Sequence, residues 1–180
     1  MIVNLRGTSG SGKTTIVRRL IANYDAKPVY GMLGWRQPEA IKLLRPAPLY
    51  ALGPYPAAGC DAVASALGVE GVIRLLEKYA ARGDVIFEGL IISSMFGAIG
   101  AWLRDHPPAI IAVLDVGLDE CRAGLSERQG NQQRAARTQE AHHLRTLQVA
   151  DKMRAAGMRV EKLNREEAVP AIIAWLTGKN

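Results

Sequence analysis

Short apolar runs and longer amphipathic stretches alternate along this chain of 180 residues. The short runs have the length and composition of buried strands, and they lie at 2–5, 28–33, 84–88, 109–114 and 158–163. Between most of them, apolar residues recur every three or four positions, as they do in amphipathic helices. This order predicts an α/β fold, with a single domain over 1–180 in which a five-stranded parallel sheet is flanked by helices on both faces.

The spacing of apolar residues predicts where the main helices lie. One follows the first strand and ends near Asn23, a second covers about 69–82, and a third closes the chain around 169–176 with Pro170 in its first turns. The longest uncharged stretch, Leu90 to Leu103, is well short of the roughly 20 residues that a membrane span needs. It is predicted to be a buried helix, and no membrane association is expected.

Two regions break this regularity. Between Gly34 and Gly59, prolines exclude one long regular element, and the pattern predicts an irregular insertion or a short helix flanked by turns. We expect this insertion, about 34–60, to bind substrate. The second region, about 117–137, holds arginines among glycine, asparagine and glutamine before a helix that starts near Thr138. It is predicted to be a mobile lid.

The residues after the first strand form a complete phosphate-binding loop, Gly7-Thr8-Ser9-Gly10-Ser11-Gly12-Lys13-Thr14. Its glycines let backbone N–H groups point at the phosphates of a nucleotide, and the helix that begins here adds the positive end of its dipole. Lys13 brings a positive charge to the transferred phosphoryl group, and the Thr14 hydroxyl is a ligand for Mg²⁺. The sequence therefore predicts that residues 7–15, with Thr15 included, bind ATP together with Mg²⁺.

Two acidic residues are candidates for metal binding and proton transfer. Glu88 ends the strand 84–88, where a carboxylate holds Mg²⁺ directly or through water; the alternative is a cap on the following helix. Asp61 follows Gly59 and Cys60 in the insertion, where it would accept the proton of an acceptor hydroxyl; the alternative is an N-cap for a helix that starts near Ala62. No partner base is visible that would make Cys60 a nucleophile.

The predicted lid contributes candidate cations. An arginine that reaches the γ-phosphate when a lid closes stabilises the charge of the transition state. Four arginines lie in or beside the lid, and most are expected to be solvated: Arg122, Arg128, Arg134 and Arg137. Arg128 is the first candidate. His142 and His143 follow, but adjacent positions on a helix do not face one ligand together, so they do not predict a metal site.

The charge and the cysteines add information on partners and location. The net charge of +6 and the pI of about 9.6 favour a polyanionic partner, although a nucleotide enzyme needs several cations for its triphosphate alone. Basic and aromatic residues interleave in and around the insertion, including Arg36 and Tyr55, as in nucleic-acid binding; packing of these aromatics on the sheet is the alternative. Cys60 and Cys121 lack the spacing of a zinc site or a disulfide framework, which indicates a reduced cytoplasmic compartment.

Several motifs together resemble the phage P-loop kinases that phosphorylate 5-hydroxymethyluracil in DNA. These are the phosphate-binding loop, Leu-Gly-Pro-Tyr at 52–55, Gly-Cys-Asp at 59–61, Phe-Glu-Gly-Leu at 87–90, and Leu-Asp at 114–115 followed by Glu-Cys and the lid arginines. The resemblance covers nearly the whole chain. Ala58 stands where the family pattern has a glycine before Gly59.

The resemblance implies a function and roles for particular residues. The γ-phosphate of ATP would pass to the hydroxymethyl group of the modified base in DNA, a step of thymine hypermodification in the host cytoplasm. It implies Asp61 as the base, Glu88 as the acid beside the metal and Arg128 as the lid cation, with Lys13 on the phosphoryl group. Arg36, Tyr55 and Cys60 would join Asp61 on the acceptor side.

Two other functions stay open from the residues alone. The same core and lid serve kinases that act on a nucleoside, a nucleotide or a sugar. A noncatalytic nucleotide-binding switch is a different class, but the chain has no Asn-Lys-x-Asp guanine-reading motif and no Asp-x-x-Gly switch motif. These absences favour a kinase.

Overall fold

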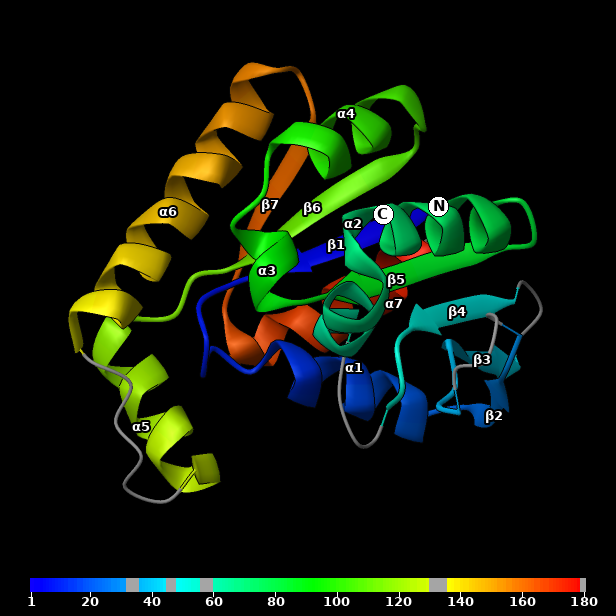
Figure 1. Ribbon diagram of the computed structural model, residues 1–180, viewed down its shortest axis with the longest axis horizontal. Helices are drawn as coiled ribbons and strands as arrows, with labels where there is room; N and C mark the ends of the chain where they lie inside the picture. The colour runs from blue at the N-terminus through cyan, green and yellow to red at the C-terminus, as the bar shows by residue number, and fades with distance from the viewer. Residues whose placement is uncertain (32–35, 45–47, 56–59, 130–135, 179–180) are drawn as a thin grey trace.

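A seven-stranded sheet forms the centre of the fold (Figure 1). In this computed structural model, residues 1–31, 36–44, 48–55, 60–129 and 136–178 are described, with only the backbone of 127–129 and 136. Along the sheet, the strands follow the order β2-β3-β4-β5-β1-β6-β7. They are β1 (Ile2–Arg6), β2 (Asp25–Val29), β3 (Ala40–Leu44), β4 (Leu49–Leu52), β5 (Asp84–Glu88), β6 (Ala109–Leu114) and β7 (Arg159–Leu163).

Five neighbouring strands, β4-β5-β1-β6-β7, are parallel. The prediction of a five-stranded, all-parallel sheet is nevertheless wrong, because β2 and β3 extend the sheet and β3 runs antiparallel to both of its neighbours. The insertion predicted to be irregular contains β3 and β4. Pro38 and Pro48 precede these strands without interrupting them, and Pro28 lies in β2 at the sheet edge, where a strand tolerates the loss of one N–H donor.

Two helices cover one face of the sheet. They are α1 (Lys13–Ala22) and α7 (Arg165–Thr177), and their apolar stripes pack on alternate strand residues such as Leu5 and Ile86. α1 ends at Ala22 with Asn23 as its C-cap, close to the predicted end, and Pro170 lies in the second turn of α7. The helix α5 (Leu118–Gln129) follows β6 and lies against the phosphate-binding loop.

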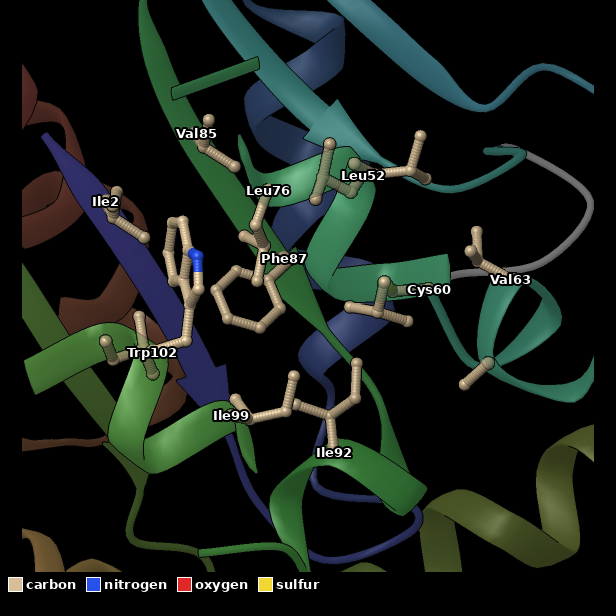
Figure 2. Packing of buried hydrophobic residues seen from close by; sticks show 14 of the residues in the cluster. Ile2, Leu52, Cys60, Val63, Leu76, Val85, Phe87, Ile92, Ile99 and Trp102 are labelled. Atoms are coloured by element: carbon tan, nitrogen blue, oxygen red, sulfur yellow. The ribbon is translucent and has the colours of Figure 1, made fainter. Parts of the chain in front are cut away.

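The other face of the sheet is covered by α2 (Cys60–Ala80), α3 (Leu90–Ser93), α4 (Gly97–Asp105) and α6 (Ala136–Ala155). Figure 2 shows Phe87 of β5 and Ile2 of β1 packed with Leu76, Ile99 and Trp102 from α2 and α4. Successive strand residues point to opposite faces, so β1 and β5 contribute to both cores. These buried layers hold the carboxyl ends of the parallel strands at one edge.

Several helices depart from the sequence prediction. The stretch Leu90 to Leu103 is not one helix, because residues 94–96 separate α3 from α4. The second helix begins earlier than predicted, at Cys60, and is broken at Gly68, whose φ of 67° is left-handed. Within the range predicted as a lid, α5 reaches Gln129 and α6 begins at Ala136, and 130–135 lie outside the described residues. No helix in the described ranges has the length and apolar character to cross a membrane.

Candidate active site

The phosphate-binding loop leaves the end of β1 and enters α1. Gly10 and Gly12 have φ values of 86° and 102°, in the left-handed region that glycine tolerates best. A Cβ atom on Gly10 would lie 2.0 Å from the carbonyl oxygen of Cys121, so only glycine fits against α5. Lys13 donates hydrogen bonds from Nζ to the carbonyls of Gly7 at 2.8 Å and Thr8 at 3.0 Å. The start of the loop therefore lies against the Lys13 side chain.

Glu88 lies directly beside this loop. The Thr14 hydroxyl donates to Glu88 Oε1 at 2.9 Å, and the Tyr55 hydroxyl donates to the same oxygen at 3.3 Å. Burial raises the pKa of the Glu88 carboxyl, while the charge of Lys13 and the hydrogen bond from Thr14 oppose that rise. The side chain is almost completely buried, so its charge is available only to groups that enter this site.

Asp61 joins the same group of residues from the start of α2. Its Oδ2 accepts a hydrogen bond from the backbone N–H of Leu90 at 2.5 Å, and its Oδ1 accepts one from Ile91 at 3.0 Å. Asp61 therefore caps α3, whereas the cap considered from the sequence was for its own helix. The approach requires Gly89, because a Cβ atom there would lie 2.3 Å from Asp61 Oδ1.

The other residues predicted on the acceptor side divide into two groups. Tyr55 and Cys60 are buried against Glu88. Burial raises the pKa of the Cys60 thiol, and the nearby charges of Glu88 and Asp61 raise it further, so the thiol stays protonated. Arg36 is exposed on the connection between β2 and β3, and the described hydrogen bonds of the site do not involve it.

The predicted lid cations are only partly described. Arg122 is on α5 and donates from Nη1 to Asp119 at 2.9 Å, one turn earlier. Arg137 is exposed near the start of α6. The backbone of Arg128 belongs to α5, while its side chain and the whole of Arg134 lie outside the described part of the chain. The lid role of these arginines stays a prediction.

Arg6 is a buried residue of the site that the sequence analysis missed. Its Nε donates to Asn4 Oδ1 at 2.5 Å, and its Nη1 donates to the carbonyls of Ser93 at 3.1 Å and Met95 at 3.0 Å. Arg6 thus holds the C-terminal end of α3, the helix whose N-terminal end Asp61 caps. Burial lowers the pKa of Arg6 to about 9, so the guanidinium remains charged at neutral pH.

Helices α6 and α7 also contact the phosphate-binding loop. His143 Nδ1 and Thr8 Oγ1 share a hydrogen bond of 2.8 Å, and Gln139 Nε2 donates to the carbonyl of Ser9 at 3.4 Å. Arg165 donates from Nε to the carbonyl of Ser11 at 3.0 Å and from Nη2 to that of Gly10 at 3.2 Å. The sequence pattern gave no sign of these contacts, since each joins residues more than a hundred positions apart.

A cavity of about 420 Å³ opens beside the loop. Its lining includes Gly10, Gly12, Thr15, Arg19, Arg165 and the acidic Glu166. No group of three His, Cys, Asp or Glu side chains with the geometry of a metal site occurs in the part of the chain that the structure describes. The candidate metal ligands are instead the Thr14 hydroxyl and the Glu88 carboxylate, and oxygen ligands of this kind suit Mg²⁺.

A phosphate-binding loop at the end of β1, the middle one of the five parallel strands, with an acid at the end of the neighbouring strand β5, defines a P-loop nucleotide-binding domain. The fold is similar to that of deoxyadenosine kinase from M. mycoides. The match to its structure with bound dATP has a TM-score of 0.50 and 11% sequence identity, and it covers 98% of this chain and 100% of the kinase chain. With bound dCTP, the TM-score is 0.51, the identity is 10% and the coverage is 99% and 100%.

Two relatives from phages match nearly the whole chain. The 5-hmdU DNA kinase of Pseudomonas phage PaMx11 is 33% identical over 181 residues, covering 95% of this chain and 94% of the relative. The 5-hmdU DNA kinase of Pseudomonas phage M6 is 27% identical over 179 residues, covering 96% and 95%. No family model matches the chain. At this identity and coverage, the chain belongs to the 5-hmdU DNA kinase family, which confirms the resemblance seen in its motifs and makes it a phosphotransferase.

Proposed function

We propose that this protein transfers the γ-phosphate of ATP to the hydroxymethyl group of 5-hydroxymethyluracil in DNA. The observation that carries the proposal is the contact between Thr14 and Glu88 beside Asp61, which brings a phosphate-binding loop and two carboxylates to one point. The names of the two phage relatives support the acceptor. The reaction is a step in thymine hypermodification, and two buried free cysteines suit a reduced cytoplasm.

The loop and its neighbours bind the nucleotide in this proposal. Residues 7–15 hold the phosphates, with Lys13 on the β- and γ-phosphates. The cavity beside Gly12, Thr15 and Arg165 receives the rest of the nucleotide, because it opens directly from the loop and has a volume of about 420 Å³. Thr14 and Glu88 would hold Mg²⁺, which neutralises phosphate charge when it is bound.

Asp61 is the proposed base for the acceptor. As the hydroxymethyl oxygen attacks the γ-phosphorus, its proton passes to the Asp61 carboxylate, and the bond from the γ-phosphorus to the bridging oxygen breaks to release ADP. Each Asp61 oxygen accepts one hydrogen bond from α3 and retains a further lone pair for this proton. We propose that the acceptor contacts Tyr55, Cys60 and Arg36. Arg128, in the predicted lid, would stabilise the negative charge on the phosphoryl group in the transition state.

A base inside a duplex does not expose its substituent to a buried γ-phosphate. The acceptor nucleotide must therefore be flipped out of the helix or offered in a single strand. The net charge of +6 favours such a polyanionic acceptor over a free nucleoside.

The test supplies matched acceptors. Purified protein is incubated with γ-labelled ATP and Mg²⁺ beside DNA that contains thymine, DNA that contains 5-hydroxymethyluracil, and the corresponding free nucleosides and nucleotides. The products are digested to nucleosides, and the mass of each nucleoside is measured by mass spectrometry. We expect phosphate on the modified base of the DNA alone, and none with Lys13→Ala. Phosphate only on a free monomer would instead identify a small-molecule kinase.

A further inference from the structure

A groove of about 680 Å³ runs between α6 and the connection from α3 to α4. Its walls include Ser94 and Phe96 on one side and Leu144, Arg145, Gln148 and Lys152 on the other. The four residues of α6 recur at helical spacing, so they form one stripe along that helix. Figure 1 shows α6 along one side of the molecule, with α3 and α4 on the same face of the sheet.

The charged residues that line this groove are all positive. Its described walls carry two cations, Arg145 and Lys152, and no carboxylate. Arg145 uses Nε to donate to the carbonyl of Ser94 at 3.2 Å, which joins α6 to the facing wall of the groove. Neither cation has an ion pair with any described residue. By contrast, Arg154 on the same helix is paired with Asp151 at 2.8 Å.

Apolar side chains accompany the cations. Leu144 is 53% exposed and lies on the same stripe of α6 as the two cations. Phe96 is half-buried in the facing wall. A groove that combines cations with apolar and aromatic side chains matches the surface of a single nucleic-acid strand, whose phosphates alternate with bases and sugars.

A short segment of the chain links the groove to the candidate active site. Glu88 is followed by Gly89, α3 and then Ser94, so one short segment leads from the buried acid to the groove wall. Asp61 and Arg6 hold the two ends of α3, and Gly7 of the phosphate-binding loop donates to Ser93 Oγ at 3.3 Å. The groove therefore has a fixed position relative to the phosphoryl-transfer site.

We propose that this groove binds a single strand of the acceptor DNA next to the nucleotide that is phosphorylated. Arg145 and Lys152 contact consecutive phosphates, and Leu144 and Phe96 contact a sugar or base between them. The proposal rests on the proposed function for the choice of DNA as the partner. It adds a site that makes a polymer a better acceptor than a free nucleoside.

The test is direct binding, which needs no catalysis. Fluorescence anisotropy is measured with a labelled single-stranded oligodeoxynucleotide that contains thymine only, using wild-type protein, Arg145→Ala, Lys152→Ala and the double variant. Each substitution should weaken binding about tenfold. The slope of log affinity against log salt should fall by about 0.7 per lost phosphate contact. Arg154→Ala is the matched control, with the same change in charge on the same helix, and should bind like wild type.

Wild-type affinity and salt slope in the double variant would overturn the proposal, as would an equal loss in Arg154→Ala. Tighter binding of duplex than of single strand, with the same dependence on Arg145 and Lys152, would overturn the single-strand assignment. Failure of the proposed function has a different outcome: the groove variants lose oligonucleotide binding, yet wild-type protein leaves 5-hydroxymethyluracil DNA unphosphorylated.

Discussion

The Thr14 hydroxyl donates a hydrogen bond to Glu88 Oε1 across 2.9 Å and so joins the first turn of α1 to the end of β5. The contact follows from the sheet: β1 and β5 are parallel neighbours, with Leu5 opposite Glu88. A loop that leaves β1 two residues later must therefore begin its helix close to this acid. Tyr55, which follows β4, donates to the same oxygen and brings a third parallel strand to the site.

Replacement of Glu88 should lower transfer activity but raise thermal stability at high pH. Burial raises the pKa of Glu88 above its ordinary value of 4.5, so the folded state binds the proton more tightly than the unfolded state. Stability contributed by Glu88 is present below pH 4.5 and is lost as the pH rises through the folded pKa. Glu88→Gln stays neutral and keeps an oxygen that accepts from Thr14 and Tyr55. We expect it to melt higher than wild type at pH 8, with a smaller difference at pH 4.

Thermal unfolding without nucleotide, measured from pH 4 to pH 8, checks this expectation. A Glu88→Gln variant that is less stable than wild type by the same amount at every pH would contradict the linkage. Transfer activity should fall by about a hundredfold or more, because the neutral amide is a poorer metal ligand than the carboxylate.

Two substitutions distinguish the role of Asp61 as a helix cap from its proposed role as the base. Asparagine caps helices about as well as aspartate but does not accept a proton at neutral pH, whereas alanine does neither. We expect Asp61→Asn to lose phosphoryl transfer by about 10² to 10⁴ while binding ATP like wild type. Asp61→Ala should be equally inactive and also less stable, by about 1 kcal/mol.

The measurements are kcat for transfer, titration of ATP binding and thermal unfolding on the same three proteins. If Asp61→Asn keeps wild-type kcat and only Asp61→Ala is impaired, the residue acts as the cap of α3 and the base must be sought elsewhere.

Removal of Arg6 should loosen α3 from the phosphate-binding loop. In Arg6→Met, the carbonyls of Ser93 and Met95 lose their charged donor, and the contact with Ser93 is buried. We expect a loss of about 3 kcal/mol in the free energy of unfolding. Urea denaturation measures this loss, and Arg104→Met on the exposed side of α4 is the control that should change it little. An equal effect of the two substitutions would contradict the role of Arg6 in holding α3.

The lid prediction is tested with a pair of arginines on α5. Arg128→Ala should lower kcat by about 10² or more with little effect on thermal stability, because its role is confined to the transition state. Arg122→Ala removes the same charge from a residue that is paired with Asp119, and it should retain wild-type kcat. Equal activity of the two variants would remove Arg128 from the proposed mechanism.

The sequence predicted the parallel core of the fold because local patterns of apolar residues mark its strands and helices. The apolar runs that became β1, β5 and β6 are bounded by turns and helices with clear periodicity. The strands β3 and β4 were missed because each is short and follows a proline, and their pairing is fixed by neighbours elsewhere in the chain. The break between α3 and α4 was missed because apolar spacing continues across it.

At the site, the sequence predicted the residues with a motif and missed those that act through long-range contacts. Lys13, Thr14 and Glu88 meet because strand order brings them together. The cap of α3 by Asp61 depends on two backbone N–H groups about thirty positions away. Arg6 offered one signal, an arginine at the end of an apolar strand, where an exposed charge is not expected. His143 and Arg165 offered none.

The most direct test of the central claim is the mass of an intact oligonucleotide. A single-stranded DNA with one 5-hydroxymethyluracil is incubated with the protein, ATP and Mg²⁺, beside a matched strand with thymine at that position and beside Lys13→Ala protein. The account predicts a gain of one phosphoryl group on the modified strand with wild-type protein only. An unchanged mass, under conditions where the free nucleoside is phosphorylated, would contradict it.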